Sequence, residues 1–99
     1  MSLTAKQMEV LLLVSKKNED ESFVDLDQIL ERVTYTTNKP SMQFIIRNLI
    51  EDKKLIQKEG FVVRRDRKRV VFRTTVLGDK YVEWNTPKEK SLKEALTAD

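Results

Sequence analysis

The sequence predicts an α+β fold with three helices, a charged β-hairpin and a fourth helix, in that order along the chain. Up to residue 55, apolar residues recur every three or four positions, which is the spacing of one face of a helix. Between residues 60 and 75, β-branched and aromatic residues flank a charged centre, as in two strands joined by a turn. Helical spacing then returns. We therefore assign residues 1–84 to one folded domain and residues 85–99 to a polar tail whose few apolar residues suffice for a marginal short helix.

The composition limits the class of protein. The chain has 99 residues, which is enough for a single modest core. It contains no cysteine, so disulfides and thiolate metal sites are excluded and a reducing compartment is favoured. No apolar run is long enough to span a membrane, and the N-terminus lacks the pattern of a signal peptide. We expect a cytoplasmic protein with no membrane partner.

The net charge of +3 is distributed unevenly along the chain. Residues 1–34 carry four basic and seven acidic side chains, whereas residues 35–75 carry eleven basic and four acidic ones. Residues 76–99 carry four basic and five acidic side chains. A separate basic region is expected where the partner is a polyanion, although lysine-rich surfaces also occur without such a partner.

The first helix is predicted over residues 3–17, because Thr4 and Gln7 have the spacing of a capping box. Its apolar side chains lie on nearly all sides, so this helix has to be covered on two sides. The side that the next two helices leave uncovered carries Val10, Leu13 and Val14.

Residues 18–22, NEDES, form a polar loop. Its acidic and amide groups lack the alternating spacing of a cation site, so we expect a solvated loop and no bound metal. A short helix over residues 24–33 follows, for which Asp25 has the N-cap position.

Residues 34–41, TYTTNKPS, form a turn rich in hydroxyl and amide side chains. Pro40 prevents a continuous helix and favours a new one that begins just after it, over residues 41–55. The core side of that helix carries Met42, Ile45, Ile46 and Leu49. The opposite side carries Gln43, Phe44, Arg47, Asn48 and Glu51.

Residues 62–72, VVRRDRKRVVF, place five cations and one acid between two pairs of valines. We predict a hairpin with a four-residue loop over residues 66–69, in which Arg65 pairs with Val70. In this register the core side of the hairpin carries Phe61, Val63, Val70 and Phe72.

The last predicted helix covers residues 74–84, with Thr75 as its cap. Gly78 lies inside it and costs about 1 kcal/mol of helix propensity, so we expect a close backbone approach at this position. One stripe of the helix carries Leu77, Tyr81 and Trp84.

Three stretches in this order resemble the winged helix-turn-helix regulators of the MarR and PadR type. LTAKQMEVLLLV is similar to their first helix, and FIIRNLIEDKKLI is similar to their recognition helix and its exit into the wing. FRTTVLGDKYVE resembles the strand that ends in a Thr-x-x-Gly helix start, here Thr75 and Gly78. The resemblance covers residues 3–84. Where the family usually leaves the recognition helix through a glycine, this chain has Lys53 and Lys54.

The resemblance implies a dimeric, sequence-specific transcription regulator that binds double-stranded DNA, with the recognition helix in the major groove. The base-reading candidates that it implies are Ser41, Gln43, Phe44, Arg47 and Asn48. The residue types suit this role, because Gln and Asn pair with adenine, Arg pairs with guanine, and Phe contacts the thymine methyl group. Two alternatives stay open: the polar residues form a solvated helix face, or Phe44 packs against the wing or the long turn.

The charged hairpin would be the wing, which reaches phosphates or a narrow minor groove. The alternative is protection of a strand edge, for which one or two charges would suffice. The candidate contacts on the hairpin are Arg64, Arg65, Arg67, Lys68, Arg69 and Arg73. Candidate phosphate contacts before and at the start of the recognition helix are Thr36, Thr37, Asn38 and Lys39.

An enzyme is not expected, because the chain lacks histidine and cysteine and has no glycine-rich phosphate loop. The sequence indicates no cofactor and identifies no effector pocket. The alternative function is a winged-helix interaction module, or part of a replication or partition complex, whose basic wing meets an acidic protein or RNA.

We also predict a homodimer, since the surplus apolar side of the first helix needs a partner. A monomer would satisfy the same side chains if the last helix alone covered that side. The candidate interface residues are Val10, Leu13, Val14, Tyr81, Trp84, Leu92 and Leu96.

Overall fold

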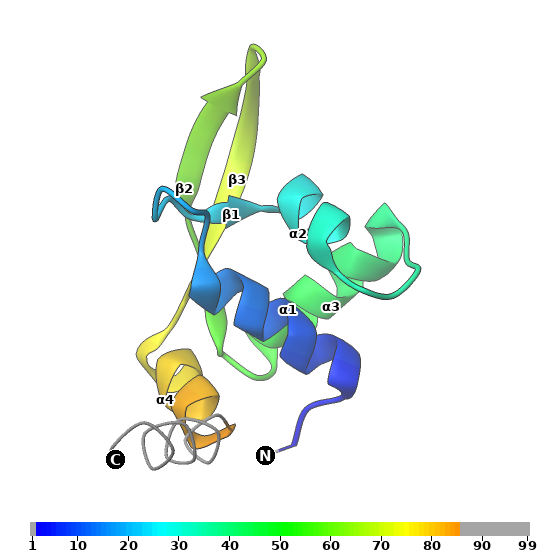
Figure 1. Cartoon of the computed structure of the whole chain (residues 1–99), viewed down its shortest axis with the longest axis vertical. Helices are drawn as coiled ribbons and strands as arrows, with labels where there is room; N and C mark the ends of the chain where they lie inside the picture. Colours follow the sequence, from blue (N-terminus) through cyan, green and yellow to red (C-terminus); the bar gives the residue numbers. More distant parts are fainter. Residues whose placement is uncertain (1, 86–99) are drawn as a thin grey trace, which may run out of the picture.

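The computed structural model describes residues 2–85, which form four helices and a three-stranded antiparallel sheet (Figure 1). Along the chain these elements are α1 (Ala5–Lys16), β1 (Val24–Asp25), α2 (Leu26–Arg32), α3 (Lys39–Glu51), β2 (Ile56–Arg64), β3 (Arg67–Thr74) and α4 (Val76–Asn85). The predicted α+β class is confirmed. The tail helix considered after residue 85 and the interface candidates Leu92 and Leu96 lie outside the described residues.

Local capping fixes where the first three helices begin. Thr4 and Gln7 form the predicted capping box of α1, and Asp25 caps α2 as expected. α3 begins two residues before its predicted start. Asn38 caps it by accepting a hydrogen bond from the Ser41 N–H at 2.9 Å, and Pro40 is tolerated because the first turn needs no N–H there.

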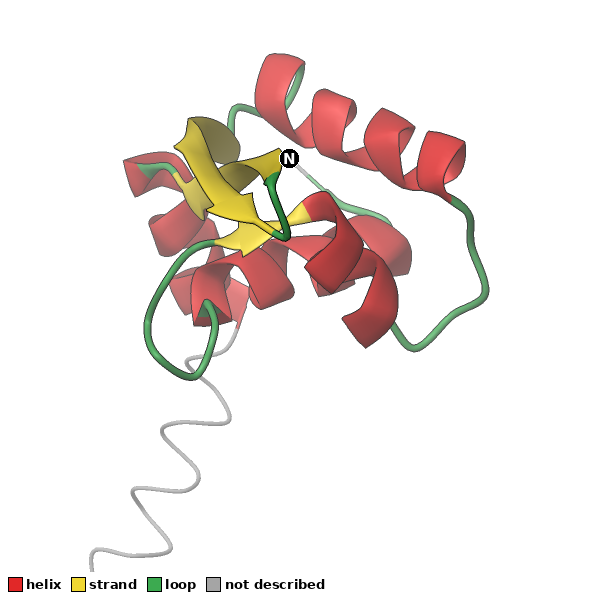
Figure 2. Ribbon diagram, turned by 90° about the horizontal axis from the view of Figure 1, so that it is seen from above, coloured by secondary structure: helices red, strands yellow, loops and turns green. Residues whose placement is uncertain are grey.

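The core lies between the first three helices, the base of the sheet and α4. Viewed from above, along the projecting hairpin, the helices lie around its base (Figure 2). The buried cluster consists of Val10, Leu11, Val14, Val24, Ile29, Met42, Ile46, Leu49, Leu55, Ile56, Phe72 and Tyr81.

The side of α1 that we expected to be uncovered is covered within the single chain. Val10 and Val14 are fully buried, and Leu13 packs against the core while half-buried. Contacts with β3 and with α4, which contributes the buried Tyr81, provide this cover. The expectation that this side of α1 needs a partner chain, which motivated the dimer prediction, is therefore wrong, because a strand as well as α4 packs against α1.

The strand β1 is an element that we did not predict. Val24 pairs with Phe72 and Asp25 with Val71, so the sheet has the order β1-β3-β2. We had included Val24 in a helix. Two residues carry no periodicity, and only the presence of β3 beside them makes them a strand.

The predicted register of the hairpin is wrong. The loop is a two-residue turn at Arg65 and Asp66, with Arg64 paired to Arg67 and Phe61 to Val70. Both turn residues have positive φ, 49° and 62°, which is the geometry of the type I′ turn that matches the twist of paired strands.

The observed register changes which hairpin residues are buried. Phe72 is buried as predicted, but Phe61, Val63 and Val70 are exposed, the first two by 60% and 66%. An irregularity in the pairing between Lys58 and Gly60 shifts the strands against each other. The apolar side chains beyond it therefore lie on a part of the hairpin that projects past the core (Figure 1).

The exit from α3 and the start of α4 are joined at one point. Lys54, which with Lys53 occupies the exit where the resembling family usually has a glycine, adopts a positive φ of 57°. Its carbonyl accepts a hydrogen bond from the Thr75 hydroxyl at 2.7 Å, and the Leu55 carbonyl accepts one from the Thr75 N–H at 3.0 Å. A Cβ added to Gly78 would lie 1.9 Å from the Leu55 carbonyl oxygen, so the predicted close approach is confirmed.

Replacement Gly78→Ala should lower the free energy of unfolding by at least about 2 kcal/mol, because neither backbone can yield without breaking the bonds to Thr75. Thermal or urea unfolding measures the change. Lys80→Ala, at an exposed position of the same helix, is the control and should change stability by less than about 0.5 kcal/mol. Equal stability of the two variants would contradict this account of the junction.

Candidate nucleic-acid interface

The outer side of α3 presents a row of exposed side chains. Ser41, Gln43, Phe44 and Arg47 are all exposed, on the side away from the buried Met42, Ile46 and Leu49. Phe44 is 69% exposed, so it does not pack against the hairpin or the turn. An exposed helix of this kind, with polar and aromatic side chains, can enter the major groove of DNA.

Asn48 is engaged within the protein. Its Oδ1 accepts a hydrogen bond from Gln7 Nε2 at 2.8 Å, and its Nδ2 donates one to Asp52 Oδ2 at 2.6 Å. Gln7 also accepts a hydrogen bond from the Thr4 N–H in the capping box of α1. Asn48 therefore ties α3 to the start of α1, and both ends of the amide that we predicted to read adenine are occupied in this structure.

The turn before α3 is held in place from α1. The Glu9 carboxylate accepts hydrogen bonds from the Thr34 N–H and hydroxyl at 2.7 and 2.6 Å. Burial raises the pKa of the Tyr35 phenol, and the negative charge of Glu9 raises it further, so Tyr35 is neutral at physiological pH. Among the phosphate candidates of this region, Thr37 is half-buried, Asn38 uses its side-chain oxygen as the cap, and Lys39 is exposed.

The cations of the hairpin fall into two groups. Arg64 Nη1 lies 2.7 Å from Asp25 Oδ2, and Arg69 Nη1 lies 2.6 Å from Asp27 Oδ2. These two arginines therefore lie against the start of α2, whereas we had expected them to project into solvent. Arg73 Nη1 lies 3.5 Å from Glu59 Oε1.

The second group lies at the tip. Arg65 and Arg67 are exposed and form no ion pair with any described residue. The Lys68 ammonium lies 4.8 Å from the centre of the exposed Phe61 ring, and this contact leaves its charge facing solvent. The tip thus offers three cations that pair with no carboxylate of residues 2–85.

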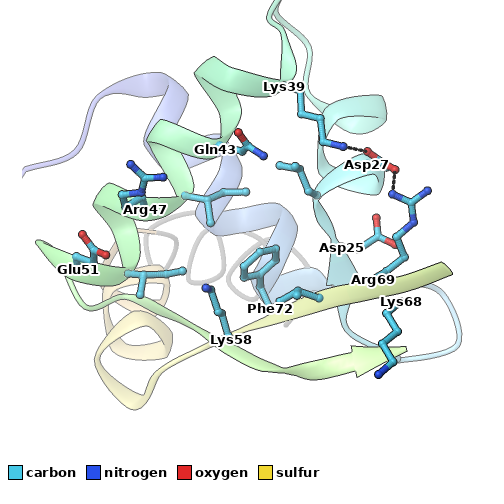
Figure 3. Close-up of a pocket in the computed structure, with 14 residues that line it drawn as sticks. Asp25, Asp27, Lys39, Gln43, Arg47, Glu51, Lys58, Lys68, Arg69 and Phe72 are labelled. Carbon is cyan, nitrogen blue, oxygen red and sulfur yellow. Dashed lines mark ion pairs between the residues drawn. The ribbon is translucent and has the colours of Figure 1, made fainter. Parts of the chain in front are cut away.

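A cleft of about 660 Å³ separates α3 from the hairpin, with the start of α2 at one end. Figure 3 shows Gln43 and Arg47 on α3, with Lys58 across the cleft on the sheet. Apolar residues such as Ile46 and Phe72 also line it. The charged lining consists of five basic and three acidic side chains: Lys39, Arg47, Lys58, Lys68, Arg69, Asp25, Asp27 and Glu51.

Residues 2–85 contain no group of three or more acidic, histidine or cysteine side chains arranged to hold a metal ion. In the loop after α1, hydrogen bonds from the Ser22 hydroxyl and N–H lower the pKa of Asp20. Within the described residues, no helix has the length and apolar character needed to cross a membrane.

No protein-family model matches this sequence, and no curated protein matches it. Solved structures do match. The A103V mutant of MepR, from a multidrug resistant S. aureus clinical isolate, has a TM-score of 0.67 at 25% sequence identity, covering 97% of this chain and 64% of that chain. The S. aureus MepR–DNA complex has a TM-score of 0.64 at 24% identity, covering 97% of this chain and 65% of that chain.

MepR is a MarR-family winged-helix transcription regulator. The chain has this winged-helix fold. Its β2–β3 hairpin is accordingly the wing, and α3 has the place of the recognition helix. The resemblance to MarR-type regulators is confirmed, and those structural neighbours are not enzymes. The chain spans slightly less than two thirds of the length of MepR.

Two substitutions on α3 should differ in their effect on stability. Asn48→Ala should cost about 1–3 kcal/mol, because it leaves the half-buried Gln7 amide without its acceptor. Phe44→Ala should change stability by less than about 0.5 kcal/mol, because its ring is exposed. Thermal unfolding of both variants measures the difference. A larger loss for Phe44→Ala would mean that the ring has a packing role.

Proposed function

We propose that the protein is a transcription regulator that binds double-stranded DNA, with α3 in the major groove and the wing on the backbone or in the minor groove. The observation that carries this proposal is the placement of two exposed surfaces beside one cleft with a basic excess. The first is the outer side of α3, and the second is the wing tip with Arg65, Arg67 and Lys68. A MepR structure that this chain resembles is a complex with DNA, which supports the same use of the fold.

The roles of the side chains follow from their chemistry. On α3, Arg47 is suited to guanine, Gln43 to adenine, and Phe44 to the methyl group of thymine. These contacts would supply sequence preference. Cations at the wing tip meet phosphates, whose contacts supply affinity without reading sequence.

The dimer is a further part of this proposal, supported by apolar side chains that are exposed on the described part of the chain. α4 exposes Val76, Leu77 and Trp84, and α1 exposes Leu12. Two-fold symmetry would place two copies of α3 in successive major grooves, about one helical turn of DNA apart. Since Val10, Val14 and Tyr81 are buried in the core, the contact would use these exposed side chains in their place.

The affinity for a random-sequence duplex should fall steeply as salt rises. Joint replacement of Arg65, Arg67 and Lys68 by alanine should flatten the log–log slope by up to ~0.9 for each lost phosphate contact. Fluorescence anisotropy over a salt series measures the slope. The matched control, Lys80→Ala on α4, should leave it unchanged, since α4 lies at the other end of the molecule from the wing tip (Figure 1). A wild-type protein that binds no duplex would rule out DNA as the partner and favour a protein ligand, and a salt-insensitive affinity would exclude phosphate contacts by the wing tip.

The dimer is tested by sedimentation at micromolar concentration, where the wild-type protein should run as a dimer. Trp84→Glu should give folded monomers. The Trp84 side chain is 65% exposed in the single chain, so a charge at this position would be buried only in a dimer interface, where burial is unfavourable. A wild-type monomer would disprove the dimer and leave DNA binding to be judged separately.

A further inference from the structure

The Asp27 carboxylate lies between two cations that come from different elements of the cleft. Its Oδ2 lies 2.6 Å from Arg69 Nη1 on the wing, and its Oδ1 lies 4.0 Å from Lys39 Nζ at the start of α3 (Figure 3). Each carboxylate oxygen thus faces one cation. A phosphate group also has oxygen acceptors and negative charge, so it would adopt the same arrangement between these two side chains.

The neighbouring pair of Asp25 and Arg64 has a different character. The side chain of Asp25 is 5% exposed, and it caps α2 by accepting a hydrogen bond from the Gln28 N–H at 2.9 Å. Breaking this pair would leave a buried charge without a partner, so it fixes the wing to α2.

Asp27, in contrast, is within reach of water and of other anions. Its side chain is 40% exposed, and those of Arg69 and Lys39 are 30% and 55% exposed. Exposed ion pairs of this kind are weak and are screened by salt, so another anion can exchange with the carboxylate. Breaking the contacts of Asp27 leaves the Asp25 anchor intact, and the wing keeps its position.

We propose that Asp27 is an internal competitor for DNA phosphates. It forms ion pairs with Lys39 and Arg69, which offset the positive charge of these two side chains, and it thereby limits the affinity for any duplex. This inference rests on the proposed DNA binding. In the bound state, a phosphate either displaces the carboxylate from the two cations or is repelled by it. Both effects weaken binding without regard to base sequence, since they act on the backbone contacts.

The test is the affinity of Asp27→Asn for a random-sequence duplex at constant salt, in the full chain. We expect binding at least about threefold tighter than in the wild type, because two cations become available for phosphates. Asp27→Glu retains the charge and should bind within twofold of the wild type. Glu83→Gln, an exposed site on α4, removes the same charge far from the cleft and should also bind within twofold.

A second comparison assigns the effect to the two cations. When both Lys39 and Arg69 are alanine, adding Asp27→Asn should give no gain. Thermal unfolding checks that each variant is folded, and Asp27→Ser serves as a second neutral variant should Asp27→Asn fail to fold.

The outcomes separate the two proposals. An Asp27→Asn affinity equal to that of the wild type overturns the competition while leaving DNA binding in place. Weaker binding overturns it too, because Asp27 would then be positioning the wing. The same gain in the doubly substituted background also contradicts it, since the effect would be a general one of net charge. A wild-type protein that binds no duplex overturns both proposals.

Discussion

The hydrogen bond from the Thr75 N–H to the Leu55 carbonyl, at 3.0 Å, joins the two ends of the wing at its base. β2 begins directly after Leu55 and β3 ends directly before Thr75, so this bond closes the hairpin, while the Thr75 side chain binds the Lys54 carbonyl and caps α4. Gly78 allows α4 to approach the Leu55 carbonyl closely. The end of α3, the base of the wing and the start of α4 meet at this junction. It therefore sets the position of the wing relative to α3, the position of α4 on α1 and the shape of the cleft.

Burial distinguishes the ways in which the basic side chains of the wing and the cleft pair with carboxylates. Near the core, where water is scarce, Arg64 is paired with the buried Asp25, since an unpaired charge there would be costly. At the exposed mouth of the cleft, Asp27 makes solvent-exposed contacts with Arg69 and Lys39. At the tip the cations have no carboxylate partner among the described residues. The cations therefore fall into three kinds. Arg64 anchors the wing, Arg69 and Lys39 pair with an exposed carboxylate, and the cations of the tip pair with none among the described residues. Only the last two kinds are suited to binding an external anion.

The helix α3 shows a similar division between exposed side chains and side chains that hold it in place. Phe44 and Arg47 are exposed and can meet a partner, whereas Asn48, one position further along, holds α3 to α1 through Gln7. A helix that has to present side chains with defined geometry needs such support, because base contacts depend on register. The exposed apolar residues of the wing, Phe61 and Val63, are likewise a consequence of register: the two-residue turn moves them beyond the core.

The sequence by itself determined the features that local chemistry controls. The capping box of α1, the Asp25 cap, the buried side of α3 and the close approach at Gly78 were all predictable, since each depends on spacing within a few residues or on the missing Cβ of a glycine. The tertiary structure decided the rest. Positive φ at an arginine is uncommon, so the turn at Arg65 gave no signal, and β1 exists only because β3 lies beside it. The partners Gln7 and Asn48, or Arg64 and Asp25, are about forty positions apart. No periodicity in a sequence encodes such a pairing, which arises only when packing brings the two elements together.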